Sequence, residues 1–326
     1  MSSVLNPQYR PAAVPPPSGQ ALAFHRALPA YAPTPVRDLG GGIWLKDESD
    51  RFGLPAFKVL GVSWAVERAL RENPAVQTLV AASAGNHGRA VAHVAGQRGL
   101  RARVFLPARS VAARREAIAE EGADVVIVDG TYEDAVRLAA EAGAHPGAIE
   151  LADVGASGPA HWVIDGYATL FAELDQAFDT IFVPVGVGSL GAAAARYGAT
   201  TGTAVIAVEP DVAACLTASL VAGEPTVVDT PGTAMAGLDC AEVSEAAWPT
   251  LLPGIRGTVT VSDEQTGAAM RALAARGLTI GHSGAAALAG LHALDGELRA
   301  AVKLDRVLLI ATEGPTDPEG YRAVIG

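Results

Sequence analysis

The chain has 326 residues, half of them apolar and 18% charged, and its formal net charge is −11. This length permits one large α/β domain or two smaller ones, each with its own core. The acidic balance argues against nucleic acid or an anionic membrane as the main partner, although backbone amides could still form a local anion site.

The sequence predicts strands that alternate with helices. Short β-branched runs predict strands at residues 41–46, 77–83, 102–106, 124–128, 180–185, 203–208 and 306–311. Alanine-rich segments of helical period predict helices that follow Lys58, Ser189, Asp211, Asp263 and Ser283 and that begin near Asn86, Ser110, Thr131 and Pro159. Such alternation is typical of a largely parallel, doubly wound α/β sheet.

The spacing of these elements predicts two α/β units rather than one very long sheet. Residues 60–165 form the smaller unit in this prediction, and residues 1–59 together with 166–326 form the larger one. Ligands of open α/β sheets bind beyond the carboxyl ends of the strands. The turns that follow strands are therefore the first candidates for a functional site.

Three features bear on the cellular compartment. Cys215 and Cys240 are too few for a disulfide framework, which fits a reducing cytoplasm. The N-terminus has neither the basic region nor the apolar region of a secretory signal. The apolar stretch 180–195 is interrupted by Pro184 and several glycines, which argues against a membrane span. We therefore expect a cytoplasmic protein.

The first candidate turn lies in "FVPVGVGSLGAAAA", where a strand is followed by glycines and a helix. Glycines let the backbone approach a phosphate, and the N-terminus of a helix supplies free N–H groups and a favourable dipole. The pattern Gly186-x-Gly188-x-x-Gly191, with Glu209 ending the next strand, also fits a dinucleotide fold, so NAD is an alternative ligand. An ordinary tight turn that needs small residues is a further alternative.

The second candidate turn lies in "LVAASAGNHGRAVAHVA". A strand ends at Ser83, the chain turns through Ala84, Gly85 and Asn86, and a helix continues from His87. Serine, asparagine and exposed amides at the start of a helix form a pocket for a carboxylate. Ordinary capping by Ser83 or Asn86 is the alternative. Capping alone does not need the whole set, and a NAD site would not predict it.

The third candidate is a lysine, one of only three in the chain besides Lys46 and Lys303. Lys58 stands in "LPAFKVLG" at the start of an amphipathic helix, where the helix dipole and the apolar neighbours disfavour its charged form. An uncharged amine is what a Schiff-base lysine needs. The alternative is a surface lysine with its charge in solvent. We expect both Lys46 and Lys303 to be solvated.

A phosphate cradle, a carboxylate pocket and a buried amine together indicate a pyridoxal phosphate enzyme that acts on an amino acid. Nothing in a dinucleotide enzyme requires the last two features. A NAD(P)-dependent oxidoreductase, which rests on the glycine turn and Glu209 alone, therefore ranks below it.

Four segments carry a family resemblance: "KDESDRFGLPAFKVLG", "SAGNHGRAVA", "VPVGVGSLGAA" and "TEGPTDPEGY". They resemble the fold-type II pyridoxal phosphate enzymes of the tryptophan synthase β family, most closely the diaminopropionate ammonia-lyases and next the threonine and serine dehydratases. The resemblance covers residues 39–321. It implies two doubly wound α/β domains with the cofactor, pyridoxal 5′-phosphate, in the cleft between them. It also implies a homodimer.

The resemblance assigns site residues one by one. Lys58 matches the lysine linked covalently to the cofactor, and Asn86 matches the asparagine beside the ring hydroxyl. Thr312 stands where this fold type places a hydroxyl or thiol against the pyridine nitrogen, which favours prompt loss of a β-leaving group. The loop for the cofactor phosphate comprises Gly186, Val187, Gly188, Ser189 and Leu190. The loop for the substrate carboxylate comprises Ser83, Ala84, Gly85, Asn86 and His87.

Three positions affect how many of the family's residue roles apply to this chain. The ammonia-lyases have an acid/base aspartate where this chain has Ala84, as the dehydratases do. A second family aspartate matches Asp153, which could protonate the leaving group or could simply start a loop. His282 replaces a usual glutamate and either tunes the cofactor or the leaving group or sits near a helix cap. From Ala84 we hypothesise that the enzyme accepts only L-substrates or that it acts on another β-substituted amino acid.

The predicted function is that of a pyridoxal phosphate-dependent ammonia-lyase of amino-acid metabolism. It eliminates the β-substituent of a diaminopropionate-like amino acid and yields a 2-oxo acid and ammonia, with Lys58 as base. A serine/threonine-type dehydratase or an amino-acid racemase on the same fold is the first alternative. A non-catalytic amino-acid or cofactor-binding protein is another, and intact Lys58 counts against it. No motif for a metal site is present.

Overall fold

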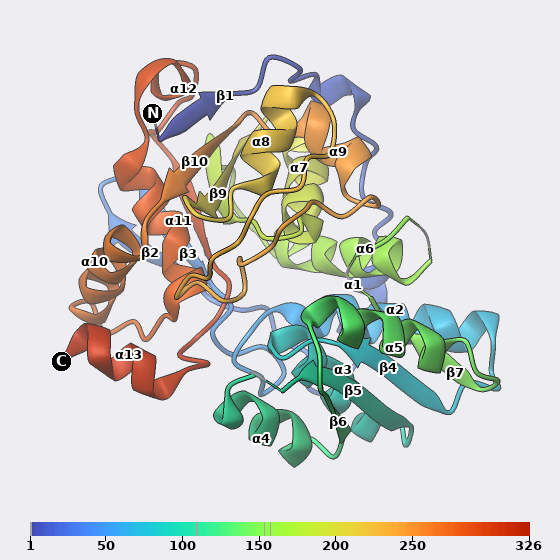
Figure 1. Cartoon of the computed structure of the whole chain (residues 1–326). Helices are drawn as coiled ribbons and strands as arrows, with labels where there is room; N and C mark the ends of the chain where they lie inside the picture. Colours follow the sequence, from blue (N-terminus) through green and yellow to red (C-terminus); the bar gives the residue numbers. More distant parts are fainter. Residues whose placement is uncertain (1, 109, 153, 157) are drawn as a thin grey trace.

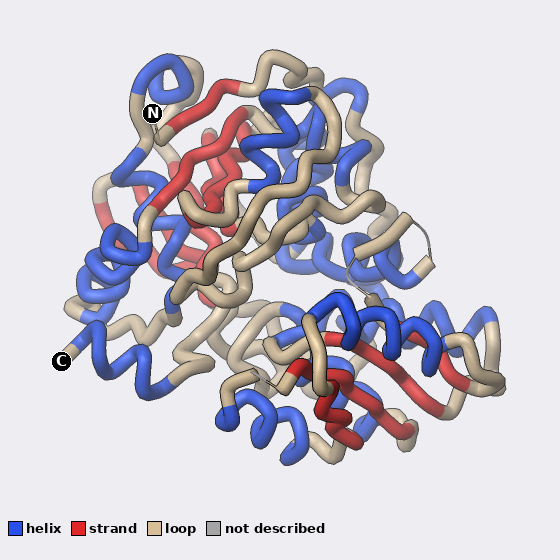
Figure 2. Tube along the Cα trace, viewed as in Figure 1, coloured by secondary structure: helices blue, strands red, loops and turns tan. Residues whose placement is uncertain are grey.

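The computed structural model describes residues 2–108, 110–152, 154–156 and 158–326. Two sheets account for the named strands of this part of the chain (Figures 1 and 2). The larger sheet contains β1 (Ser3–Leu5), β2 (Val36–Gly40), β3 (Ile43–Asp47), β8 (Thr180–Pro184), β9 (Ala204–Pro210), β10 (Gly257–Val261) and β11 (Val307–Ala311). The smaller sheet contains β4 (Thr78–Ala82), β5 (Arg101–Pro107), β6 (Asp124–Val128) and β7 (Ala148–Glu150).

The helices connect these strands in the alternating manner that the sequence predicts. The first half of the chain forms α1 (Gln20–Arg26), α2 (Lys58–Glu72), α3 (Asn86–Gln97), α4 (Ala112–Glu120), α5 (Tyr132–Gly143) and α6 (Pro159–Ala172), with a short 3-10 helix at Pro11–Ala13. The second half forms α7 (Ser189–Thr201), α8 (Cys215–Ala222), α9 (Trp248–Gly254), α10 (Asp263–Ala274), α11 (His282–Ala293), α12 (Gly296–Ala300) and α13 (Pro318–Ile325).

Both sheets are built on parallel strands. The larger sheet has the order β1-β10-β9-β8-β11-β3-β2, and only its edge strands β1 and β2 pair antiparallel with their neighbours. The smaller sheet, β6-β5-β4-β7, is parallel throughout. This confirms the predicted doubly wound α/β class. Because β3 pairs with β11, the segment after residue 47 meets the segment after residue 311.

The inner strands β8, β9, β10 and β11 of the larger sheet are largely buried on both faces, as parallel strands covered by helices are. Along β8, Ile181 and Val183 pack in one hydrophobic cluster and Phe182 packs in the other, as the period of two in a strand requires. The first cluster also contains residues of α2, α6 and the smaller sheet. One continuous apolar core therefore joins the two sheets, and α2 packs against α6 within it.

Some elements differ from the expectation. The sequence reading missed β1, β2, β7 and β10. Two of these have three residues, and β2, "VRDLG", carries two charged side chains, so pairing with a neighbour rather than local propensity determines them. The helix expected after Asp211 begins only at Cys215 because a turn closes between Pro210 and Ala213. The domain boundaries near residues 60 and 165 fall inside α2 and α6, and that division stays a prediction.

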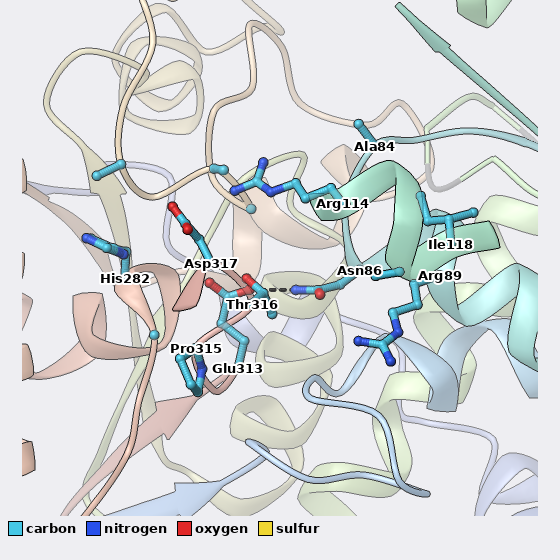
Figure 3. A pocket seen from close by; sticks show the side chains of 16 residues that line it. Ala84, Asn86, Arg89, Arg114, Ile118, His282, Glu313, Pro315, Thr316 and Asp317 are labelled. Atoms are coloured by element: carbon cyan, nitrogen blue, oxygen red, sulfur yellow. Dashed lines mark hydrogen bonds between the residues drawn. The ribbon is translucent and has the colours of Figure 1, made fainter. Parts of the chain in front are cut away.

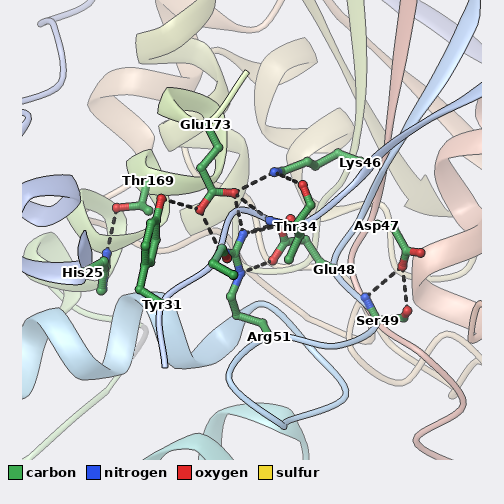
Figure 4. A network of polar contacts seen from close by, with 11 residues as sticks. His25, Tyr31, Thr34, Lys46, Asp47, Glu48, Ser49, Arg51, Thr169 and Glu173 are labelled. Carbon is green, nitrogen blue, oxygen red and sulfur yellow. Dashed lines mark hydrogen bonds and ion pairs between the residues drawn. The ribbon is translucent and has the colours of Figure 1, made fainter. Parts of the chain in front are cut away.

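The expectation of a solvated Lys46 is wrong, because its side chain is fully buried in an ionic cluster (Figure 4). Lys46 Nζ lies 2.6 Å from Glu173 Oε2. Arg51 binds Glu173 at 2.7 Å and Glu48 at 2.6 Å. We refer to Lys46, Glu48, Arg51 and Glu173 as the buried ionic cluster. It fastens the segment that follows β3 to the end of α6.

The charges of this cluster compensate one another. Burial alone would raise the pKa of Glu173, but the hydrogen bonds from Arg51 and the charges of Arg51 and Lys46 outweigh it and lower that pKa. Two cations face two carboxylates, and Thr34 supplies further contacts to Lys46 and Arg51. Removing one member leaves an uncompensated charge in the core.

We expect Glu173→Ala to lower the free energy of unfolding by about 3–5 kcal/mol, because the buried Lys46 would lose its carboxylate contact and Arg51 would keep only that to Glu48. Urea unfolding followed by circular dichroism measures the change. The matched control is Glu141→Ala, which removes an exposed ion pair with Arg137 and should change the midpoint little. Equal losses in both variants would contradict the stabilising role of the cluster.

Candidate active site

The candidate residues gather at the carboxyl ends of strands from both sheets, as expected for a doubly wound fold. Gly186 to Leu190 follow β8, Thr312 follows β11, and the turn at 83–87 follows β4 of the smaller sheet. Lys58 is the first residue of α2 and is reached from β3 by a loop of ten residues, 48–57.

A short antiparallel contact holds Lys58 beside the end of β11. Ala56 forms a β-bridge with Glu313. Phe57 N donates to the Thr312 carbonyl at 3.3 Å, and Gly314 N donates to the Pro55 carbonyl at 3.0 Å. The first turn of α2 therefore starts at a fixed place next to Thr312.

The loop before Lys58 is itself a tight turn. Arg51 and Leu54 exchange two backbone hydrogen bonds of 2.8 and 3.1 Å. Between them Phe52 and Gly53 have φ angles of 58° and 79°. The left-handed region costs a phenylalanine free energy that a glycine does not lose. The buried Arg51 side chain holds this turn in place.

The surroundings of Lys58 are aromatic. Its Nζ lies 5.5 Å from the centre of the Phe57 ring and 5.9 Å from that of Tyr167. Tyr167, on α6, is fully buried and packs against Gly61 one turn further along α2, where an added Cβ would overlap its ring. Lys58 itself is half-buried, not fully buried as the sequence predicted, and the two rings cover one side of its amine.

Glu313 connects the two sides of the site (Figure 3). Its Oε2 accepts a hydrogen bond of 2.5 Å from Asn86 Nδ2, at the start of α3. Its Oε1 accepts one of 3.2 Å from Ser283 N, at the start of α11. The side chain of Glu313 is almost fully buried. Both carboxylate oxygens are thus committed to groups of the protein.

The turn at 83–87 does not serve as an ordinary helix cap. In the described structure the residue before α3, Gly85, makes no side-chain cap, and Asn86 turns instead to Glu313. His87 Nε2 contacts the Leu151 carbonyl at 2.5 Å, which anchors the turn to the segment after β7. The first N–H groups of α3 lie outside the hydrogen-bond ladder of the helix and can bind an anion.

The glycine turn after β8 is closely surrounded. A Cβ on Gly186 would lie 2.9 Å from both Cys240 Sγ and the Gly237 carbonyl. Gly188 has a φ of 99°, and α7 starts immediately after it. The N-terminus of α7, the positive end of the helix dipole, therefore lies next to Gly186 and Gly188, which have no side chains. Such a turn suits a phosphate group.

Thr312 has an unsatisfied hydroxyl. It is 4% exposed, and within the described residues its Oγ1 has no hydrogen-bond partner. A buried hydroxyl without a partner costs about 1–3 kcal/mol. A ligand atom with a lone pair or a proton at this place would satisfy it.

Glu209, on which the NAD alternative partly rests, has another role. It is fully buried, and its oxygens accept hydrogen bonds of 2.7 and 2.8 Å from Leu216 N and Thr217 N at the start of α8. Burial raises its pKa to about 7, against the lowering effect of these bonds. The side chain is therefore not available to a ribose hydroxyl.

A pocket lies in front of the turn at 83–87 (Figure 3). Ala84, Asn86, His282 and Glu313 line it, so the sequence-predicted Ala84 and His282 meet in one place. Asp153 lies outside the described residues. Within those residues no group of three or more His, Cys, Asp or Glu side chains is arranged to hold a metal ion.

Glu313 and Arg114 are among the residues of this pocket that sequence reasoning missed. Glu313 stood within the quoted "TEG" segment, but its role depends on contacts to Asn86 and Ser283, which are distant in sequence. Arg114, on α4, also lines the pocket. It belongs to "AARREA", whose charges gave no signal beyond that of a solvated helix face.

Comparison with known proteins identifies the family. Residues 27–313 match the pyridoxal-phosphate dependent enzymes. The chain belongs to this family. It is 34% identical to diaminopropionate ammonia-lyase of Salmonella typhimurium, over 94% of this chain and 91% of that protein. It is 29% identical to the biosynthetic L-threonine dehydratase of Escherichia coli, over 78% of this chain and 51% of that protein.

A solved structure of the family has the same fold. Diaminopropionate ammonia lyase from Escherichia coli, in complex with an aminoacrylate-PLP azomethine reaction intermediate, superposes with a TM-score of 0.90 and 29% sequence identity. The match covers 99% of this chain and 96% of that one. The chain therefore has the fold of the fold-type II pyridoxal phosphate enzymes, and pyridoxal 5′-phosphate is its cofactor.

The side chains of the site fit this cofactor. The glycine turn with the N-terminus of α7 suits its phosphate, the unsatisfied Thr312 hydroxyl suits its ring nitrogen, and Lys58 supplies an amine beside Thr312. In the described part of the chain, none of the helices combines the length and apolar character needed to cross a bilayer.

Gly85 and Gly88 allow a matched test of how closely the chain packs at the start of α3 in this pyridoxal phosphate enzyme. A Cβ on Gly88 would overlap the Ser83 carbonyl oxygen, whereas the nearest atom to a Cβ on Gly85 is Ser83 Oγ at 4.0 Å. We expect Gly88→Ala to cost about 1–3 kcal/mol of stability and Gly85→Ala considerably less. Thermal unfolding of both variants measures the difference, and equal costs would contradict the close approach at Gly88.

Proposed function

We propose that this enzyme catalyses α,β-elimination on a β-substituted amino acid, giving a 2-oxo acid and ammonia. The observation that carries the proposal is the β-bridge between Ala56 and Glu313, which places Lys58 beside Thr312 while Glu313 holds Asn86 of the facing turn. An amine, a ring-nitrogen partner and a carboxylate turn are thereby fixed relative to one another. The names of the relatives support this reaction.

In this proposal the cofactor supplies an electron sink that makes the α-proton of the bound amino acid acidic. The free amides at the start of α3 bind the substrate carboxylate. Lys58 holds the cofactor in the resting enzyme and, once released, removes the α-proton as a general base. The rings of Phe57 and Tyr167 lie beside the amine.

The remaining groups tune the elimination. Thr312 would offer its hydroxyl to the ring nitrogen, and a hydroxyl does not force the ring to stay protonated as a carboxylate would. The α C–H and β C–X bonds break, and the C–H electron pair forms the new double bond. The leaving group departs with the electron pair of the β C–X bond. The released enamine reacts with water to give the 2-oxo acid and ammonia.

Two further residues extend the proposal. Asp153 is proposed to protonate the leaving group, as in the family position that it resembles. His282 starts α11 and lines the pocket together with Glu313, so it is placed to contact the leaving group or the substrate carboxylate. We also propose a cytoplasmic homodimer. The two free cysteines are consistent with a reducing compartment, and the dimer rests on the family resemblance.

A second function has a specific observation in its favour. Ala84 lines the pocket and offers no acid or base at the position where the ammonia-lyases carry an aspartate. A serine/threonine-type dehydratase would need none there, whereas a racemase on the same fold would have to take its second acid or base from another residue. Product analysis separates the three: ammonia with a 2-oxo acid from diaminopropionate, the same from serine or threonine, or an inverted amino acid.

Replacing Lys58 tests the assignment of the base. We expect Lys58→Ala to lower turnover by at least about 1,000-fold. We also expect that borohydride reduction will no longer attach the cofactor to the peptide that contains residue 58. Absorbance spectra and mass mapping of the reduced protein measure the adduct. Lys303→Ala, an exposed lysine, is the control and should keep both. Near-normal activity of the Lys58 variant would refute the assignment.

The position of Ala84 predicts the stereochemical preference. The unmodified protein should turn over L-substrates and leave the D-enantiomers almost untouched, because the second face of the substrate lacks its base. A positioned acid or base contributes about 10²–10⁴-fold, so Ala84→Asp should raise turnover of D-diaminopropionate by roughly 100-fold. Ammonia release from each enantiomer is the measurement. Strong D-turnover by the unmodified protein would refute this explanation.

A further inference from the structure

Arg114 is a positive charge in the pocket that the reaction above does not use. It lies on α4 above the smaller sheet, is half-buried and lines the pocket together with Ala84 and Asn86. Within the described residues its guanidinium makes no hydrogen bond and no ion pair. The other arginine of the pocket, Arg89, is by contrast paired with Glu121 at 3.0 Å.

The acids of the pocket are already engaged. Both oxygens of Glu313 accept hydrogen bonds, from Asn86 and from Ser283. Asp317 caps α13, where its Oδ1 accepts a hydrogen bond of 3.0 Å from Gly320 N and the helix dipole offsets its charge. Figure 3 shows Arg114 and Asp317 reaching into the pocket from opposite sides. Among these charged side chains, Arg114 is therefore the one that makes no hydrogen bond within the described residues.

We propose that Arg114 binds an anionic β-substituent of the substrate, a phosphate or sulfate ester, and stabilises it as the leaving group. This inference rests on the elimination proposed above. The α-carboxylate already has neutral donors at the start of α3, so a second, cationic group points to a second anion. A guanidinium matches a planar or tetrahedral oxyanion with two parallel N–H donors.

The chemistry of the step favours such a partner. When the bond between the β-carbon and the ester oxygen breaks, the oxygen takes the bonding pair and the negative charge of the leaving group rises. The α C–H pair becomes the carbon–carbon double bond, and the proton goes to Lys58. An arginine near the departing oxyanion stabilises the transition state more than the bound substrate. A β-ammonium group gains nothing from the same arginine.

The test compares four substrates in the holoenzyme: O-phospho-L-serine, O-sulfo-L-serine, the neutral O-acetyl-L-serine and the cationic L-2,3-diaminopropionate. Arg114→Met should lower kcat/KM for the first two by roughly 10- to 100-fold, the size of a lost charge-assisted contact. It should change kcat/KM for the neutral and cationic substrates by no more than about 3-fold. Arg114→Lys should retain part of the activity. The two anionic substrates distinguish phosphate from sulfate as the preferred group.

Arg115→Met is the matched control, because Arg115 is the next residue on α4, equally half-buried and outside the pocket lining. It should leave all four values unchanged. An equal loss on every substrate in Arg114→Met would overturn the proposal, since it would place Arg114 at the α-carboxylate or in the fold. Turnover of diaminopropionate without turnover of either ester would also overturn it and leave the elimination intact. Failure of all four substrates would instead refute the proposed function.

A binding measurement is independent of turnover. O-phospho-L-serine should raise the unfolding temperature of the unmodified protein and of Arg115→Met, and the shift should be lost in Arg114→Met. O-acetyl-L-serine should give similar shifts in all three proteins. A phosphoserine shift that persists in Arg114→Met would overturn the role of Arg114.

Discussion

The site depends on one short backbone contact, the β-bridge between Ala56 and Glu313. It joins a loop from the first fifth of the chain to the end of the last strand, and the pairing of β3 with β11 brings the two within reach. Lys58 follows the bridge on one strand and Thr312 precedes it on the other. A backbone contact of this kind is insensitive to side-chain rotamers, so it fixes the main chain of Lys58 next to that of Thr312.

Two different forces keep the loop in place on its other side. The buried ionic cluster anchors Arg51 to Glu48 and to the end of α6, and a phenylalanine in the left-handed region closes the turn that follows. An ionic cluster in a core adds less stability than its short distances suggest, because the charges lose their hydration. Its effect here is geometric, since only one arrangement compensates all four charges. The strain at Phe52 is tolerated because the flanking contacts determine the turn.

Much of this could be predicted from the sequence, and the rest could not for identifiable reasons. Glycine turns and helix starts are local, so Gly186 to Leu190 and the turn at 83–87 were recognised from short patterns. The alternation of strands and helices predicted the fold class. Glu313 was missed because its contacts join distant segments, and Arg114 because the lining of a pocket is set by the folded chain rather than by a local pattern. Lys46 was misjudged because a strand pattern does not reveal that a carboxylate from α6 will cover its end.

Glu313 also acts as a mechanical link between the two sheets. One of its oxygens holds the start of α3, which belongs to the smaller sheet, while the residue itself continues from β11 of the larger sheet. Moving the start of α3 away from the end of β11 would stretch this 2.5 Å bond and expose a buried carboxylate. An enzyme with a weaker link at this position would open more readily and hold the carboxylate turn less precisely.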